Sequence, residues 1–147
     1  MKCIILAAGY GTRLYPLTRD LPKPLLTVGG KPIIEHIIAR LEPLPHIQEI
    51  IVVTNDRFYS QFQQWEACFS SRFSILVLND GTKSNEDRLG AIGDVYFVIQ
   101  HTNLDDNLLV IGGDNLFDFD LGEAVEEFFR LRRSVIGVYD MGDPAKV

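Results

Sequence analysis

Short apolar runs alternate with helical patterns along this chain. The apolar runs predict strands at 2–7, 49–54, 74–78, 107–112 and 134–139. Apolar residues that recur on one helical face predict helices at 33–41, 56–69, 87–100 and 121–132. This alternation predicts one α/β domain over residues 1–147, with a mainly parallel sheet between two layers of helices.

Polar segments follow three of the predicted strands. They are a glycine-containing loop after 2–7, the segment 79–86, and the segment 112–115, which contains Asp114. Ligands of open parallel sheets bind beyond the carboxyl ends of the strands, so these segments are expected to converge on one site. The topology therefore places Asp114 opposite the glycine-containing loop.

Composition narrows the classes of partner. The net charge is −6 and no run of basic residues occurs, which argues against a nucleic-acid partner. No segment approaches the ~20 apolar residues that a membrane-spanning helix needs, so no membrane partner is expected. Cys3 and Cys68 are isolated and lack metal-site spacing. These features predict a cytoplasmic protein.

The loop after the first strand carries the most specific signal. Residues 6–14 read L-A-A-G-Y-G-T-R-L, in which small residues and glycines let the backbone approach a ligand closely. Arg13 and Lys23 add a guanidinium fork and a compact positive charge. Backbone N–H groups and two cations are what a polyphosphate requires, so the segment predicts a nucleotide site.

Two common phosphate motifs do not fit this loop. Gly9 and Gly11 begin like the dinucleotide fingerprint, but Leu14 stands where the third glycine belongs and Pro16 blocks an early helix. A Walker loop ends in Gly-Lys-Ser/Thr, and the chain contains no such triplet.

What does fit is a longer series of motifs that runs from Lys2 to about Ile38. The glycine loop is followed by P-x-T, then P-K-P-L, then G-K-P-I-I-E-H. The series resembles the N-terminal signature of the sugar-1-phosphate nucleotidylyltransferases. The resemblance implies the Rossmann-like sheet of nucleotide-diphospho-sugar transferases, and an enzyme that joins a nucleoside triphosphate to a sugar 1-phosphate with release of pyrophosphate.

The resemblance also implies roles for individual residues. Arg13 and Lys23 are expected to be catalytic, and Asp114 to bind Mg²⁺, the only cofactor expected. Asp114 could instead close a turn, while Asp118 or Asp120 could substitute for it, although Asp120 is better placed to cap the next helix. The residues expected to bind the nucleotide are Leu6, Ala7, Ala8, Gly9, Gly11, Thr12, Arg13, Asn79 and Gly90.

The chain departs from the family pattern between Ser84 and Asp94. Hexose-phosphate enzymes usually carry an element of the type G-T-A-G-A-L there, where this chain reads S-N-E-D-R-L-G-A-I-G-D. In the family this region normally contacts the base and the sugar, so the identity of the base and that of the acceptor both stay open. The alternatives are a cytidylyltransferase for another phosphorylated alcohol such as phosphocholine, and a non-catalytic nucleotide-binding or assembly module.

Enzymes of this family continue well beyond position 147, with an acceptor pocket and a second metal-binding aspartate. We therefore expect a C-terminally truncated domain with little or no transferase activity by itself. The family's sheet has an antiparallel strand between the strands that correspond to 107–112 and 134–139. Without it, 134–139 is expected to pair directly with 107–112, or a second copy of the chain to pair there and form a homo-oligomer.

Overall fold

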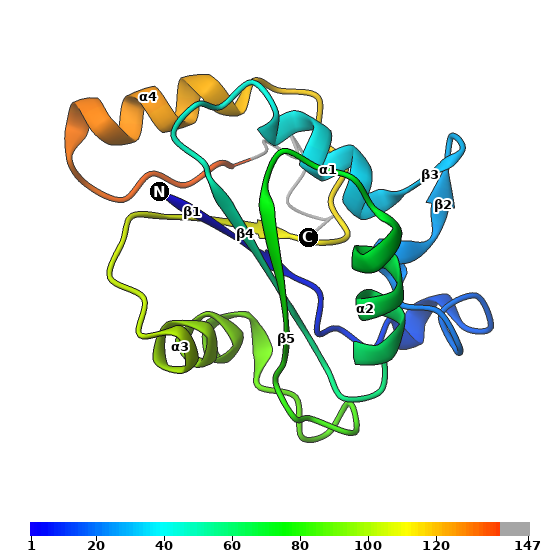
Figure 1. The fold of residues 1–147 in the computed structure, drawn as a ribbon. Coiled ribbons are helices and arrows are strands. Elements are labelled where there is room, and N and C mark those ends of the chain that lie inside the picture. Colours follow the sequence, from blue (N-terminus) through cyan, green and yellow to red (C-terminus); the bar gives the residue numbers. More distant parts are fainter. Residues whose placement is uncertain (139–147) are drawn as a thin grey trace, which may run out of the picture. The chain divides into compact units, whose positions relative to one another are not determined.

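A computed structural model describes residues 1–138. The chain divides into two compact units, Met1–Phe117 and Asp118–Val147. The first unit contains a parallel sheet in the order β5-β4-β1-β6 (Figure 1). Its strands are β1 (Lys2–Leu6), β4 (Glu49–Thr54), β5 (Ser74–Asn79) and β6 (Leu108–Gly112). The parallel sheet expected from the sequence is confirmed, and the single domain over 1–147 stays a prediction.

Helices cover both faces of this sheet. On one face, Ile4, Ile51 and Val53 form a buried cluster with Val98 of α3 (Gly90–Thr102). Alternate residues of the same strands, such as Ile5, point to the other face and are also fully buried. Figure 1 shows α1 (Ile33–Leu41) and α2 (Tyr59–Cys68) on the side of the sheet opposite α3. The predicted three layers are therefore present in the first unit.

The chain between β1 and α1 contains only short elements. They are η1 (Thr12–Leu14), η2 (Lys23–Leu25), β2 (Thr27–Val28) and β3 (Lys31–Pro32), of which the last two form an antiparallel pair. This segment lies between the carboxyl end of β1 and the start of α1, so it carries the predicted phosphate-binding residues at the ligand-binding edge of the sheet.

Two predicted helices begin later than expected. The helix predicted over 87–100 starts at Gly90, because the Asp87 carboxylate accepts hydrogen bonds from the backbone N–H groups of Lys83 and Ser84 and so belongs to the preceding loop. The helix predicted over 56–69 starts at Tyr59. Local side-chain hydrogen bonds of this kind compete with the first turn of a helix.

The second unit contains α4 (Leu121–Leu131). Asp120 Oδ1 accepts from Gly122 N at 2.8 Å, which confirms the expected helix cap. The strand predicted over 134–139 is wrong for 134–138, which form no regular element; Tyr139 lies outside the described residues. An apolar run becomes a strand only when a neighbouring strand takes up its backbone hydrogen bonds, and no ladder forms at 134–138.

The outer edge of β6 is therefore not closed in the way expected. Within residues 1–138, β6 pairs with β1 alone, so direct pairing with 134–138 is wrong. Pairing of β6 with a second copy of the chain stays a prediction. Each helix in the described part of the chain is too short or too polar to span a bilayer.

Candidate nucleotide-binding site

The loop that follows β1 is fixed from behind by hydrogen bonds to one of its N–H groups and one of its carbonyl groups. Ala7 donates its backbone N–H to Val53 O at 2.8 Å, and the fully buried Asn55 donates from Nδ2 to Ala8 O at 2.8 Å. Gly9 is exposed, and its N–H donates to no other group in residues 1–138. A loop anchored in this way leaves the exposed Gly9 N–H available to an anion.

The next turn is closed by Gly11 and Thr18. Gly11 has φ +62°, a left-handed conformation that L side chains rarely adopt, and a Cβ there would lie 3.1 Å from the Thr18 side chain. Thr18 is fully buried and donates from Oγ1 to Gly11 O at 2.6 Å. The turn leads into η1, where Thr12 and Arg13 are exposed. Arg13 makes no ion pair with any described residue, so its guanidinium is available to a ligand.

Lys23 and Asp114 meet across 91 residues of sequence. Lys23 Nζ lies 2.8 Å from Asp114 Oδ2, in a salt bridge whose side chains are 34% and 47% exposed. Lys23 begins η2 between two prolines, which fix the backbone on either side of it. The structure therefore brings together the predicted catalytic lysine and the predicted metal ligand, and leaves both open to solvent.

Gly113 explains how Asp114 reaches this position. Gly113 donates its N–H to Leu6 O at 2.8 Å, which ties the end of β6 to the end of β1. A Cβ at position 113 would lie 2.8 Å from that same backbone oxygen and 3.2 Å from Pro24. Only glycine allows this close approach, and the approach sets the next residue, Asp114, beside η2.

A second support comes from the beginning of α2. The Arg57 guanidinium donates from Nη2 to Arg19 O and from Nη1 to Tyr15 OH at 3.4 Å. Gln61 Nε2 donates to Asp20 O at 3.2 Å. These contacts hold residues 15–20, the segment that joins η1 to η2 and hence Arg13 to Lys23.

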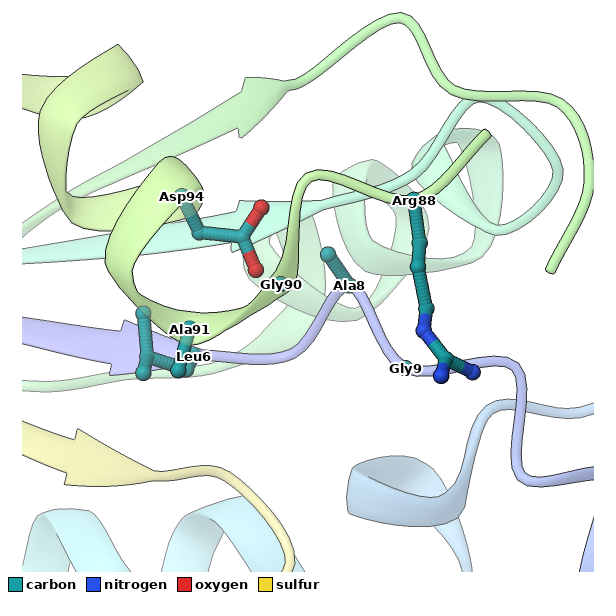
Figure 2. A pocket seen from close by; sticks show the side chains of 7 residues that line it. All are labelled: Leu6, Ala8, Gly9, Arg88, Gly90, Ala91 and Asp94. Atoms are coloured by element: carbon teal, nitrogen blue, oxygen red, sulfur yellow. The ribbon is translucent and has the colours of Figure 1, made fainter. Parts of the chain in front are cut away.

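A cavity of about 180 Å³ lies between the glycine loop and the start of α3 (Figure 2). It is lined by Leu6, Ala8, Gly9, Arg88, Gly90, Ala91 and Asp94. The predicted nucleotide-binding residues Leu6, Ala8, Gly9 and Gly90 thus share one cavity. The predicted role of Gly90 beside the glycine loop is compatible with this geometry.

Asp94 is the unusual group in this cavity. Its side chain points into the cavity in Figure 2, although the residue is only 5% exposed. The buried Oδ1 has no hydrogen-bond partner among the described residues. Burial, together with the charge of Asp80, raises the pKa of the Asp94 carboxyl from 3.8 to about 6. Asp80 Oδ2 is likewise buried and unpartnered, while Asp80 Oδ1 accepts from the N–H and hydroxyl of Thr82.

Two other residues predicted to bind the nucleotide do not line this cavity. Asn79 donates from Nδ2 to Asp56 Oδ1 and accepts from Gly81 N, both at 2.8 Å, and it does not line the cavity. Its expected role in nucleotide binding stays a prediction. Ala7 is buried behind the loop.

The sequence-based hypothesis missed Arg88 and Asp94. A signal for Asp94 was present, because it falls on the helical stripe formed by Ala91, Val95 and Val98, where an apolar residue would be expected. Arg88 had no such signal, because it is an exposed residue of a polar loop.

The donor set around Asp114 fits a divalent cation held jointly with a ligand. No three His, Cys, Asp or Glu side chains in residues 1–138 are grouped to hold a metal ion by themselves. Asp114 is nevertheless a partly exposed carboxylate beside a lysine. Mg²⁺ is commonly bound by one or two carboxylates together with substrate phosphates, so a single carboxylate suits a metal that arrives with a polyphosphate.

Comparisons with known proteins identify the family of this chain. A sequence profile of the family described as nucleotidyl transferase matches residues 2–146. The bifunctional protein GlmU of Methanocaldococcus jannaschii is 33% identical over 136 residues, which cover 92% of this chain and 29% of that protein. The mannose-1-phosphate guanyltransferase of Debaryomyces hansenii is 32% identical over 130 residues, which cover 86% of this chain and 34% of that protein.

A solved structure shares both fold and sequence. The CTP:phosphocholine cytidylyltransferase of Streptococcus pneumoniae superposes with a TM-score of 0.60 at 31% identity, and the match covers 82% of this chain and 47% of that one. The chain thus spans less than half the length of each of these three relatives. The resemblance seen in the motifs is confirmed: the chain belongs to the nucleotidyl transferase family.

Proposed function

We propose that this chain is the nucleotide-binding part of a nucleotidylyltransferase that couples a nucleoside triphosphate to a sugar 1-phosphate. The observation that carries the proposal is the Lys23–Asp114 salt bridge beside an anchored glycine loop. It sets a cation beside a carboxylate of the kind that Mg²⁺ prefers, at the same edge of the sheet as the exposed N–H of Gly9. Relatives that are sugar-1-phosphate nucleotidyltransferases support the same activity.

The reaction needs no protein nucleophile. An anionic oxygen of the sugar phosphate forms a bond to the α-phosphorus of the triphosphate, the bond from that phosphorus to the β-phosphate oxygen breaks, and pyrophosphate leaves. The protein has to hold anions together and neutralise the charge that develops. Arg13 would bind the departing phosphates, and Lys23 the α-phosphate and the incoming phosphate.

Mg²⁺ is the metal that we propose for Asp114. Members of the family generally use a divalent metal, and a hard oxygen ligand next to phosphates suits Mg²⁺. When bound, the ion would neutralise charge on the phosphates. The Lys23 ammonium group donates to one oxygen of the Asp114 carboxylate, which leaves the other oxygen for a metal ion.

Binding by the 147-residue chain tests the proposal without requiring turnover. Arg13→Ala should lower the affinity for a Mg-nucleoside triphosphate by about tenfold or more, and leave the affinity for the nucleoside within about threefold. Calorimetry with both ligands measures this. Arg40→Ala, on the exposed face of α1, is the matched control. Equal losses for triphosphate and nucleoside would contradict a phosphate role for Arg13.

A second candidate is a cytidylyltransferase that acts on phosphocholine or a similar phosphorylated alcohol. The 31% identity to the pneumococcal enzyme favours it. The phosphate chemistry would be the same, so base preference and acceptor separate the two candidates. Pyrophosphate release by the full-length protein, measured with each triphosphate and acceptor pair, distinguishes them.

The cellular location that we propose is the cytoplasm. Both cysteines are free thiols, and burial strongly raises the pKa of the Cys3 thiol, which keeps it protonated and unreactive. Detection of the protein in a fractionated cell extract tests this location.

A further inference from the structure

The cavity beside the glycine loop contains a group that the phosphate chemistry does not use. Asp94 is 5% exposed and is aimed into the cavity, and its Oδ1 accepts no hydrogen bond from residues 1–138 (Figure 2). Leaving a buried carboxylate oxygen without a donor costs free energy, and an apolar residue would pack there without that cost. A purely structural role therefore does not explain Asp94.

The same cavity also offers hydrogen-bond donors. Among residues 1–138, no side chain caps the start of α3, so the N–H groups of its first turn are available to a ligand. Arg88 lines the cavity with its guanidinium, which donates to Asn85 Oδ1 at 2.6 Å and keeps further N–H groups for other acceptors. The cavity thus combines a carboxylate acceptor with several donors.

This pattern can be compared with the edges of the nucleobases. Guanine presents two adjacent donors, N1–H and N2–H₂, next to the acceptor O6. Uracil and thymine present one N–H between two carbonyl oxygens, and cytosine and adenine present one amino group beside a ring nitrogen acceptor. A carboxylate satisfies both donors of guanine, whereas with each other base it meets at least one acceptor and repels it.

We propose that the cavity binds the base of the nucleotide and that Asp94 selects guanine, by accepting hydrogen bonds from N1–H and N2–H₂. The N–H groups at the start of α3 and Arg88 supply donors for O6. This inference rests on the proposed function, because it takes the phosphates to lie at the glycine loop. It makes the triphosphate substrate a guanosine nucleotide.

The test is a set of calorimetric titrations of the 147-residue chain with Mg-GTP, Mg-CTP, Mg-UTP and Mg-ATP at neutral pH. We expect Mg-GTP to bind about tenfold or more tightly than the other three. Asp94→Asn keeps the shape but replaces one acceptor by a donor, so it should lower GTP affinity about tenfold and change UTP affinity by less than about threefold. Asp105→Asn, at an exposed position after α3, controls for the loss of one negative charge.

Arg88→Met provides a second variant that does not alter a buried side chain, because Arg88 is exposed. It should reduce the preference for GTP by a few-fold. Equal binding of all four triphosphates, or a preference for another base that Asp94→Asn leaves unchanged, would overturn the inference and leave the proposed function standing. Failure to bind any triphosphate would overturn both.

One competing explanation is tested with the same proteins. In that explanation, the carboxylates of Asp80 and Asp94, each with one buried and unpartnered oxygen, together hold a cation. If Mg²⁺ or Ca²⁺ alone raised the melting temperature of the wild type but not of Asp94→Asn, the cavity would be a cation site and the guanine inference would be wrong. Under the inference, neither ion distinguishes the two proteins in the absence of nucleotide.

Discussion

The parts of the candidate site that we propose for the phosphates and for the base, called the phosphate side and the base side, are built in different ways. On the phosphate side, backbone groups do most of the positioning: Asn55 holds Ala8 O, and Gly113 N holds Leu6 O. On the base side, a single buried side chain, Asp94, carries the distinctive chemistry. Backbone positioning suits a ligand group that every nucleotide shares, whereas base selection needs side-chain donors and acceptors in a fixed pattern.

The two sides also differ in tolerance to change. A backbone that approaches another backbone closely has no room for an added atom, whereas a cavity lined by side chains can accept an isosteric replacement. Changes on the phosphate side should therefore affect stability and geometry together. Changes on the base side should affect specificity with little loss of structure.

The largest effect is expected for Gly113→Ala. The added Cβ would lie 2.8 Å from Leu6 O, a backbone atom that cannot move without disturbing β1. We expect the free energy of unfolding to fall by about 2–3 kcal/mol, and Mg-triphosphate binding to weaken because Asp114 moves away from Lys23. Urea denaturation and calorimetry measure the two effects.

Gly9→Ala is the control for this substitution. Gly9 lies in the same site, and no atom of the described residues would lie within 4 Å of a Cβ added there. Its free energy of unfolding should change by less than about 0.5 kcal/mol. If Gly9→Ala and Gly113→Ala lost the same stability, close backbone approach would not be what fixes position 113.

The phosphate side and the base side also differ in how far the sequence alone could predict them. The residues of the phosphate side could be proposed from the sequence because their signals are local and their order is specific: Gly9, Gly11 and Arg13 in one loop, and Lys23 between prolines. The meeting of Lys23 with Asp114 was expected only in outline, from the rule that strand ends converge. The contact itself depends on how η2 packs against the end of β6.

The base side was not predicted because burial decides its chemistry. Asp94 looks like an ordinary polar residue until α3 is packed on the sheet and removes its carboxyl from water. The predicted strand is wrong over 134–138 for a related reason, because an extended segment becomes a strand only beside a neighbouring strand. Non-local packing is the information that a pattern along the chain lacks.

The next-largest effect is expected when the positive charge of Lys23 is removed from the phosphate side. Lys23→Ala is expected to weaken Mg-triphosphate binding by about tenfold. The free energy of unfolding should change by less than about 1 kcal/mol, because exposed salt bridges contribute little. Calorimetry and urea denaturation on the same protein separate the two quantities.

A double-mutant cycle with Asp114→Ala distinguishes two roles for Lys23. If Lys23 and Asp114 each act on the ligand, both single variants bind weakly and the double variant binds more weakly still. If Lys23 only blocked the carboxylate, Lys23→Ala would bind Mg-triphosphate more tightly than the wild type. That second result would contradict the proposed site.

A smaller effect is expected on the base side, where substitution of Asp94 should raise the free energy of unfolding and not lower it. The reason is the pH dependence of stability. The pKa of Asp94 is raised to about 6 in the folded chain, above the ordinary 3.8, so the folded state binds this proton more tightly than the unfolded state. The resulting stabilisation is fully present below pH 3.8 and is lost as the pH rises through about 6. Burial is the larger cause of this raised pKa, and the negative charge of Asp80 adds to it by repelling the charged form of Asp94.

Asp94→Asn removes this titration. Relative to the wild type, the variant should gain on the order of 1 kcal/mol in free energy of unfolding at about pH 7.5, and less at about pH 4.5. Urea denaturation at both pH values measures the difference, with Asp105→Asn as the control. A constant difference between variant and wild type at both pH values would show that burial does not hold the Asp94 proton. If Asp94 is retained for binding and not for stability, Asp94→Asn should be more stable than the wild type and should lose the preference for GTP.

The smallest expected effect concerns Arg57, which supports the phosphate side without touching the ligand. Its guanidinium donates to both Arg19 O and Tyr15 OH, and a lysine ammonium at position 57 cannot reproduce that fork. Arg57→Lys should therefore leave global stability within about 0.5 kcal/mol and loosen residues 15–20 locally. Hydrogen exchange measures this at the amides of Leu17 and Arg19, which donate to Leu14 O and Pro16 O at 2.9 and 3.1 Å.

Tyr15→Phe is the matched control, because it removes only the longer of the two Arg57 contacts. We expect exchange at Leu17 and Arg19 to be about threefold faster in Arg57→Lys and nearly unchanged in Tyr15→Phe. Because the segment joins Arg13 to Lys23, Arg57→Lys should also weaken Mg-triphosphate binding by about twofold to threefold and leave the preference among bases as it was. A change in base preference without a change in loop exchange would mean that the two sides of the site are not independent, and that Arg57 acts on the base-binding cavity.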